Sequence, residues 1–529
     1  MRIHLLNLFS NRGGGSTAPL FKNLIHISLL LIVLLSVFLL VSGTAFASGI
    51  EPSDTVDDLG DGLTYHQITS LDHLEWICTN QPASLSLNYL LMEDLDLAGV
   101  TWFEPIGSHP IYSIGSYSYT GVFNGNNKTI SNVTFGDSST EYAGLFGYTN
   151  GATIENLMLK NFYITGFYGL GTLAGGSFNT KISNVHATGQ VSGSMYGKCF
   201  GGLIGDYGSD TSSFISNCSA LVDVIGGEFG GGHVGGFVGY LAEYGNGGII
   251  SDCFAAGNVS GGWGVGGFVG SYSSDGNFLF SRCYYESGVV SGFGSVGGFA
   301  GYINVDYPTI MMDLYAAPAL LDADFTFGES GGFFGYKYGG IVITNAYTTA
   351  SPFFGPSNNI YSGDIFENCF YVDDSLPEDP QPGNISRVHS STLKNISTFL
   401  TAADAVSLGL TPSDTIYVDE SWEIVGWDDP NSIWYTFNNS IYPRFSWDYS
   451  VPHTNPGGSG SGHGNATIVD PVKPEFSVTY EPESATSDSF KPIPVEQVPD
   501  ESVIVIFFFM SAIAVFAFIC IKNKSIDEN

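Results

Sequence analysis

Basic residues are scarce in this chain. Its 529 residues include 16 lysines and arginines against 51 aspartates and glutamates, which gives a formal net charge of −35. Because such a surface repels phosphate groups, nucleic acid and anionic lipid are excluded as partners. The acidity is typical of a protein that stays soluble in a salty exterior, and diffuse binding of divalent cations is the alternative.

The chain also lacks the clusters of reactive side chains that catalysis requires. Few basic residues and no recurring acidic pair occur between residues 143 and 335. Enzymes that cleave polysaccharides use clustered carboxylates or a base beside a cation. We therefore expect no catalytic residue, no bound metal and no cofactor. Glu93, Asp94 and Asp96 come nearest to a metal cluster, but their alternation with Leu95 and Leu97 favours the outer face of a strand.

Apolar residues at helical spacing are absent from the middle of the chain. One pentapeptide, small-small-apolar-apolar-Gly, occurs there seven times. The copies begin at Ala143, Gly171, Gly201, Gly235, Gly266, Gly297 and Gly331. Their last glycines are 28, 30, 34, 31, 31 and 34 residues apart. Self-similarity at this period predicts stacked units that share one core. The paired glycines are expected where a side chain would clash with the neighbouring unit.

A second motif, typified by Ile182-Ser183-Asn184-Val185, follows most of the pentapeptides. Its two apolar positions are three residues apart, so a straight strand would point them to opposite faces. Asn tolerates left-handed backbone angles, so we place a turn at the Asn. Stacking predicts a structural ladder of Asn132, Asn156, Asn184, Asn217, Asp252, Asp313, Asn345 and Asn368, with Arg282 as the exception.

Cysteines form a second predicted ladder, at Cys218, Cys253 and Cys283. A rung spacing near 4.8 Å permits disulfides, but stacked parallel neighbours point their Cβ atoms the same way. Buried free thiols are therefore favoured over disulfides. A zinc site is disfavoured because no histidine recurs beside the cysteines.

Beyond the turn, apolar and polar residues alternate, as in Cys218, Ala220, Val222 and Val224. Alternation predicts half-buried strands, and short strands that return at a fixed period indicate a parallel β-helix. The predicted fold is all-β, a right-handed β-solenoid of about 8–10 coils with a C-terminal transmembrane helix.

Both ends of the chain carry apolar segments. The first, at residues 24–41, follows three basic residues and precedes Ala45-Phe46-Ala47, which indicates a cleaved signal peptide, with an uncleaved anchor as the alternative. The second, at residues 503–521, is long enough to span a membrane, and Lys522 and Lys524 behind it place the C-terminus in the cytoplasm. A buried globular helix is its alternative.

These features divide the chain into seven segments. They are the signal peptide (1–47), an N-terminal cap with the first coils (48–142), the repeat solenoid (143–375), a closing segment (376–450), an acidic stalk rich in Gly, Ser and Pro (451–502), the membrane helix (503–521) and a cytoplasmic tail (522–529).

The pentapeptide and the Ile-x-Asn motif resemble those of GLUG-repeat surface proteins of bacteria and archaea. The resemblance extends to residues 94–97, 105–107 and 124–132 near the start, and to residues 393–399, 422–427 and 442–445 near the end. It covers about residues 64–447 and implies a β-solenoid with an adhesin-like role. No catalytic residue of that family is carried over.

Surface chemistry is expected outside the repeated motifs, in the loops between the pentapeptides. Exposed aromatic rings at Tyr196, Tyr240, Trp263 and Tyr272 could stack on sugars, or else pack in the core or anchor loops. Glycosylation sites are predicted at Asn127, Asn258, Asn384, Asn395, Asn438 and Asn465, whereas Asn132 and Asn217 should stay unmodified in the ladder.

The sequence thus predicts a membrane-anchored cell-surface protein, not an enzyme, that displays a solenoid for adhesion to surface glycans or for contact with other envelope proteins. The alternatives are a polysaccharide lyase or hydrolase on the same fold and a purely structural envelope component.

Overall fold

The computed structural model describes most of the chain between residues 49 and 390. The gaps in that range are residues 58, 109–116, 210–212, 228–231, 244–247, 275–277, 307–308, 324–328, 357, 359–360, 362 and 376–384. Beyond it the described residues are Leu393, 415–418, 424–425, 433–437 and 443–445. The predicted signal peptide, stalk, membrane helix and tail lie outside the described residues.

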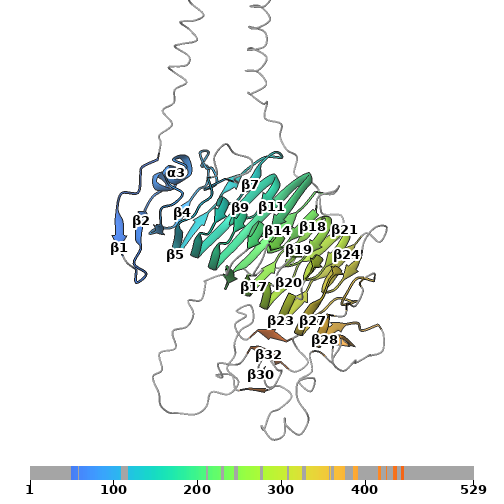
Figure 1. Cartoon of the computed structure of the whole chain (residues 1–529). Coiled ribbons are helices and arrows are strands. Elements are labelled where there is room, and N and C mark those ends of the chain that lie inside the picture. The colour runs from blue at the N-terminus through green and yellow to red at the C-terminus, as the bar shows by residue number, and fades with distance from the viewer. Residues whose placement is uncertain are drawn as a thin grey trace, which may run out of the picture. The chain divides into compact units, whose positions relative to one another are not determined.

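Strands stack along one axis from the first coils to the last, which makes the chain a parallel β-solenoid (Figure 1). One side is a 7-stranded parallel sheet with one strand per coil. Its strands are β8 (Phe146–Asn150), β10 (Ala174–Phe178), β12 (Ile204–Ser209), β16 (Val238–Glu243), β19 (Val269–Ser274), β22 (Ala300–Val305) and β26 (Phe334–Tyr338). Each of these strands begins inside or just after a pentapeptide, as the repeat predicts.

The remaining sides of each coil belong to a single 22-stranded sheet that bends around the core. Strands that contain or flank the Asn turn are β5 (Val122–Ser131), β9 (Thr153–Leu170), β11 (Lys181–Gly201), β13 (Phe214–Ser216), β14 (Ser219–Ile225), β17 (Ile249–Ala256), β20 (Leu279–Glu286), β23 (Thr309–Ala317), β27 (Ile341–Thr348), β28 (Ile365–Val372) and β29 (Ile385–Val388). Strands that lead into the next pentapeptide are β15 (Gly232–Gly235), β18 (Val259–Gly266), β21 (Val289–Gly297), β24 (Leu320–Ala323) and β25 (Ser330–Gly331).

The pentapeptide places an aromatic ladder in the core. Phe237, Phe268, Phe299, Phe333 and Phe353 stack face to face with ring centroids 4.7 to 5.1 Å apart. The glycine just before the Phe is required because the backbones are in close contact. A Cβ atom at position 236 or 267 would collide with the carbonyl oxygen of the equivalent glycine one coil further on.

The N-terminal end is closed by short strands and one helix. The elements are β1 (Thr55–Asp57), β2 (Thr64–Ile68), α3 (Leu71–Thr79), β3 (Tyr89–Leu91), β4 (Leu95–Asp96), β6 (Thr134–Phe135) and β7 (Glu141–Ala143). The helix was not predicted. Ser70 caps it by accepting a hydrogen bond from the backbone N–H of His73, and Leu74, Ile77 and Cys78 bury its apolar side in the solenoid core.

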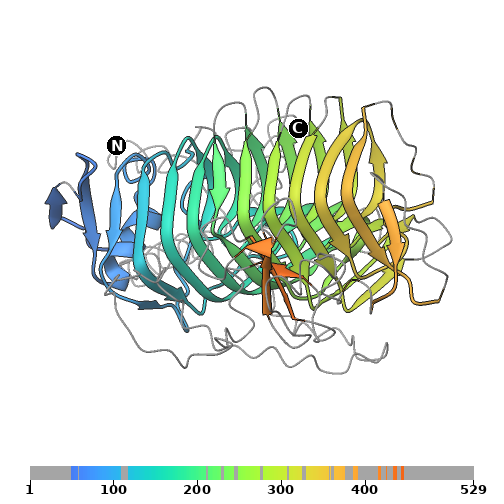
Figure 2. The ribbon, with the colours of Figure 1, turned by 90° about the horizontal axis from the view of Figure 1, so that it is seen from below.

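A small antiparallel sheet packs on the outside of the later coils (Figure 2). Its strands are β30 (Thr415–Val418), β31 (Ile424–Val425), β32 (Trp434–Phe437) and β33 (Arg444–Phe445). Trp434 and Phe445 cover a ladder of stacked tyrosines, Tyr284, Tyr315 and Tyr347, and both covering rings are fully buried. The described strands of the predicted closing segment therefore lie against the side of the solenoid.

Two parts of the predicted fold class need correction. The solenoid has about seven full turns instead of 8–10, because β28 and β29 extend only the larger sheet and add no strand to the 7-stranded one. The described residues contain no helix of the length and apolarity that a membrane crossing requires. The predicted membrane helix at 503–521 lies outside those residues, and the observed architecture is the all-β solenoid without it.

Candidate functional site

The residues of the predicted Asn ladder share one backbone conformation. All eight have φ between 51° and 59°, and so does Arg282, with φ of 51°. Four of the amides donate to the previous coil: Asn184 Nδ2 lies 2.9 Å from Asn156 Oδ1, and Asn217 Nδ2 lies 3.2 Å from Asn184 Oδ1. Asn345 and Asn368 repeat this pattern over Asp313 at 3.0 Å. In these coils the ladder therefore satisfies polar groups at the turn.

Asn132 does not belong to this ladder. A bulge between Asn124 and Lys128 moves Asn127 under the ladder, where its Oδ1 accepts from Asn184 Nδ2 at 3.2 Å. Asn132 instead accepts from Asn161 Nδ2 at 2.9 Å and donates to Asp96 Oδ1 at 2.7 Å, in a separate column. Its assignment to the main ladder was wrong because the bulge shifts the register.

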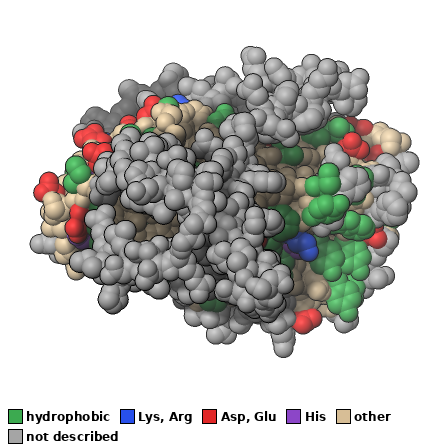
Figure 3. Space-filling view, turned by 90° about the horizontal axis from the view of Figure 1, so that it is seen from above, with side chains coloured by type: hydrophobic (Ala, Val, Ile, Leu, Met, Phe, Trp, Pro, Cys, Tyr) green, Lys and Arg blue, Asp and Glu red, His purple; other side chains and the backbone are tan. Residues whose placement is uncertain are grey.

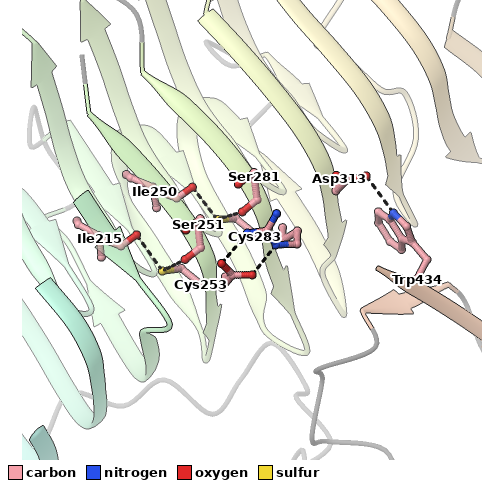
Figure 4. Close-up of polar contacts among 10 residues, drawn as sticks. Ile215, Ile250, Ser251, Cys253, Ser281, Cys283, Asp313 and Trp434 are labelled. Carbon is pink, nitrogen blue, oxygen red and sulfur yellow. Dashed lines mark hydrogen bonds and ion pairs between the residues drawn. The ribbon is translucent and has the colours of Figure 1, made fainter. Parts of the chain in front are cut away.

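The two aspartates in the ladder carry no amide and receive other donors (Figure 4). Arg282, the sequence exception, donates to both oxygens of Asp252 at 2.5 and 2.8 Å, and this bidentate contact raises the arginine pKa. Trp434 Nε1 donates to Asp313 Oδ1 at 3.1 Å. Arg282 therefore departs from the Asn pattern because its guanidinium donates to Asp252, which carries no donor of its own.

The cysteine ladder consists of free, buried thiols. Cys253 and Cys283 are in register on neighbouring strands, and each thiol donates to a backbone carbonyl: Cys253 to Ser251 at 3.0 Å and Cys283 to Ser281 at 3.3 Å (Figure 4). Cys218 makes the same contact with Ser216 at 3.1 Å. These thiols act as small core residues with weak donors.

The acidic and glycosylation candidates have mixed outcomes. Asp94 Oδ1 accepts a hydrogen bond from the backbone N–H of Thr129 at 2.7 Å, so this carboxylate helps to hold one coil to the next. Glu93 is the residue before it in the sequence. Asn258 is half-buried and its Oδ1 accepts from the Val289 N–H at 3.0 Å. Glycosylation at Asn127 and Asn258 stays a prediction. Asn384, Asn395, Asn438 and Asn465 lie outside the described residues.

A candidate ligand site lies where each coil bends just before its pentapeptide. The bend residues Tyr142, Gly169, Cys199, His233, Gly264 and Ser295 all have φ between 53° and 71°. Register places them above one another, with Glu329 next after Ser295. We call these seven residues the bend column.

A second column faces the bend from the 7-stranded sheet. It contains the residue that directly follows each pentapeptide: Tyr148, Gly176, Asp206, Tyr240, Ser271, Tyr302 and Tyr336. We call it the flank column. Between the two columns lies a cavity of about 460 Å³, within the roughly 300–1,000 Å³ typical of small-ligand sites. It is lined by Gly232, His233, Trp263, Gly264, Ser271, Ser295, Tyr302, Glu329 and Tyr336.

Aromatic rings form much of the cavity wall. The Trp263 side chain is 47% exposed and extends over Gly294 of the next coil, where a Cβ atom would lie 2.6 Å from the indole ring. Tyr302 and Tyr336 stack in parallel with ring centroids 5.4 Å apart. Glycine at position 294 thus leaves room for the indole to span two coils.

Three buried polar atoms in this wall have no hydrogen-bond partner among the described residues: His233 Nδ1, Ser271 Oγ and Glu329 Oε2. Ser271 is only 1% exposed. A buried polar group without a partner costs about 1–3 kcal/mol, and native proteins rarely retain several in one place. A ligand with hydroxyl or amide groups would satisfy all three.

The electrostatics of the wall favour a neutral imidazole. Burial lowers the pKa of His233 to about 4, with a smaller contribution from the positive charge of Lys198. One coil before Tyr240, burial raises the pKa of Asp206 to about 6. At neutral pH the cavity wall therefore contains a neutral histidine together with the Glu329 side chain.

Sequence reasoning found only part of this site. Trp263 lines the cavity, Tyr240 lies 4.6 Å from His233 between ring centroids, and Tyr196 is exposed. For Tyr272 the structure supports the alternative of core packing, since its side chain is only 1% exposed. Its hydroxyl accepts from Thr309 Oγ1 at 3.1 Å in the core.

The site residues that the sequence did not reveal occupy fixed positions next to the pentapeptides. His233, Ser295 and Glu329 stand two residues before a pentapeptide, and Ser271, Tyr302 and Tyr336 stand one residue after. The expectation that surface chemistry lies in the loops between copies overlooked these fixed positions. Comparing the flanking residues of successive copies would have shown a polar and aromatic set in the later coils.

Comparisons with known proteins add limited information. No family model matches the chain. A stretch of 134 residues, 24% of this chain, is 37% identical to part of halomucin from Haloquadratum walsbyi. That stretch spans only 1% of the length of halomucin.

A crystal structure from Bacteroides ovatus, provisionally named an immunoglobulin A1 protease, is 18% identical and covers 61% of this chain and 83% of its own. Its TM-score of 0.36 is too low to carry an argument about activity. The solenoid fold and the halomucin match together point to a surface or extracellular protein.

Proposed function

We propose that this chain is a surface or extracellular binding protein, adhesin-like in character, whose ligand occupies the cavity between the bend and flank columns. The observation that carries the proposal is the set of three unpaired polar atoms, on His233, Ser271 and Glu329, beside the exposed Trp263 ring. Ligand sites combine an apolar wall with a few convergent polar groups in this way.

The rigid solenoid suits this role. Both columns are fixed by parallel hydrogen bonding between coils, so the wall is largely formed before a ligand arrives. A preorganised wall avoids the entropy of ordering loops on binding. Halomucin is the relative that favours an exterior setting. Membership of the GLUG-repeat family stays a prediction.

Binding without catalysis is the simpler proposal. Among the described residues that line the cavity, Glu329 is the one carboxylate, whereas glycoside hydrolysis uses a pair. A polysaccharide-cleaving activity is the second candidate, and the fold alone favours it.

The test uses the labelled full chain against immobilised cell-surface polysaccharides and glycoproteins. We expect wild type to bind at least one of them and Trp263→Ala to bind at least about thirtyfold more weakly, as for a central aromatic contact. Tyr163→Ala is the matched control, because Tyr163 is 49% exposed on β9 and does not line the cavity. Equal binding by wild type and Trp263→Ala, or no binding at all, would contradict the proposal, and cleavage of the bound polysaccharide would favour an enzyme.

A further inference from the structure

We propose that the ligand is a neutral polysaccharide that lies along the solenoid axis, an inference that rests on the binding function proposed above. The bend-column members of the wall, His233, Gly264, Ser295 and Glu329, come from four successive coils. At about 4.8 Å per coil, the site extends for roughly 14 Å along the axis. An elongated site of this kind fits a stretch of chain better than a single sugar.

The aromatic wall provides the flat apolar faces that sugar rings require. The Trp263 ring is exposed and spans two coils above Gly294, and the stacked pair Tyr302 and Tyr336 continues in the same direction. Aromatic rings offer large contact areas at low conformational cost. Successive sugar rings along the axis would therefore meet successive aromatic surfaces.

The unpaired polar atoms match hydroxyl groups. Glu329 Oε2 only accepts, Ser271 Oγ donates and accepts, and the neutral His233 ring does either at Nδ1 according to its tautomer. A sugar hydroxyl also donates and accepts, so one ligand can serve all three groups. A peptide side chain seldom brings several such groups to one place.

The charge of the cavity wall distinguishes neutral from anionic polysaccharides. None of the nine described residues that line the cavity is Lys or Arg, and Glu329 presents a carboxylate oxygen without a partner. Uronates, sulfated sugars and phosphates would meet repulsion from Glu329, and Lys198, whose charge acts on His233, does not line the cavity. A quaternary ammonium ligand would suit the aromatic rings and Glu329, but its nitrogen has no N–H to donate to Ser271 Oγ. The wall therefore favours a neutral chain.

The experiment is calorimetric titration of the full chain with neutral hexasaccharides (cello-, malto-, manno- and xylohexaose), uronate hexamers and choline. We expect a neutral hexamer to bind, its monosaccharide to bind at least about tenfold more weakly, and Ser271→Ala to lose about five- to tenfold in affinity. Because Ser271 Oγ has no partner among the described residues, the same variant should keep or raise the urea midpoint of unfolding, which separates binding from folding.

Glu329→Gln discriminates between the ligand classes. The amide still accepts a hydroxyl, so affinity for the neutral hexamer should fall by no more than about tenfold, while uronate binding should become stronger. Binding of choline or of uronates in preference to every neutral hexamer, or loss of all binding in Glu329→Gln, would overturn the inference. Trp263-dependent binding to immobilised surfaces without any neutral-hexamer binding would overturn it as well and leave the broader function standing.

Discussion

His186 and His233 are half-buried in the wall of the solenoid, and they connect its stability to pH. Burial lowers the pKa of both to about 4, from 6.5. Between pH 4 and 6.5 the unfolded chain binds more protons than the folded chain. The stability that the two neutral histidines contribute is therefore complete above pH 6.5 and is lost as pH falls towards 4. Asp206, whose pKa is raised to about 6, opposes this trend below pH 6.

We therefore expect the free energy of unfolding to fall between pH 6.5 and 4. Each histidine steepens the slope by at most about 1.4 kcal/mol per pH unit. The double variant His186→Gln, His233→Gln should flatten the curve, measured as urea midpoints across this range. Gln retains a donor for Asn184 Oδ1, which lies 3.2 Å from His186 Nε2, so the ladder contact is preserved. An unchanged slope in the double variant would refute the pKa argument.

Backbone turns were the most predictable residue-scale feature. The three-residue spacing of the apolar positions required a kink, and Asn is among the few residues that take left-handed angles readily. The preference of Asn for left-handed angles does not explain why Arg282 occupies this turn. Its ion pair with Asp252, one coil earlier, explains it. Asn132 was misplaced because a bulge in the preceding coil is invisible in the spacing of motifs.

At the scale of elements, the repeat predicted the strand that starts at each pentapeptide and the alternating strand beyond the turn. Helix α3 was not predicted, since its apolar side is confined to Leu74, Ile77 and Cys78 within one nine-residue element. The candidate site was largely missed for another reason. Its side chains are not apolar-periodic, and only the register between coils shows that the bend and flank columns meet.

The phenylalanine ladder gives a prediction at this scale. Phe299 is fully buried between Phe268 and Phe333, with centroids 5.1 and 5.0 Å away. Phe299→Ala should cost about 3–5 kcal/mol of unfolding free energy by leaving a cavity. Phe299→Leu should cost less than about 1.5 kcal/mol, because Leu173 and Leu203 fill the equivalent position in earlier coils. Chemical denaturation measures both, and equal losses would show that ring stacking, not volume, stabilises the ladder.

The whole molecule combines a polar, acidic exterior with apolar surface towards its later coils. On the face in Figure 3, hydrophobic side chains gather towards the end of the solenoid that carries these coils. Leu320 in β24 and Ile365 in β28 are exposed apolar residues of these coils. The tyrosine ladder of the same region is covered by the β30–β33 sheet, so this sheet shields part of the apolar surface that the last coils would otherwise expose.

Docking of that sheet depends on Trp434, which gives the last prediction. The indole is fully buried, contacts Tyr315 and Tyr347, and donates to Asp313 Oδ1 at 3.1 Å. Trp434→Ala should weaken docking by about 3–5 kcal/mol, because it leaves a cavity and removes a donor from a buried carboxylate.

Hydrogen exchange should then accelerate in β32 and β33, and less strongly in β23 and β27 beneath them, while β9 and β11 stay protected. Trp263→Ala is the matched control, since its exposed indole does not belong to the cluster around the tyrosine ladder, and it should change none of these rates. If exchange in β32 is the same in Trp434→Ala as in wild type, the sheet is held by its other contacts, such as the Tyr347 hydroxyl that donates to the Pro443 carbonyl at 2.6 Å. Acceleration spread over every coil would instead mean that the sheet stabilises the solenoid as one cooperative unit.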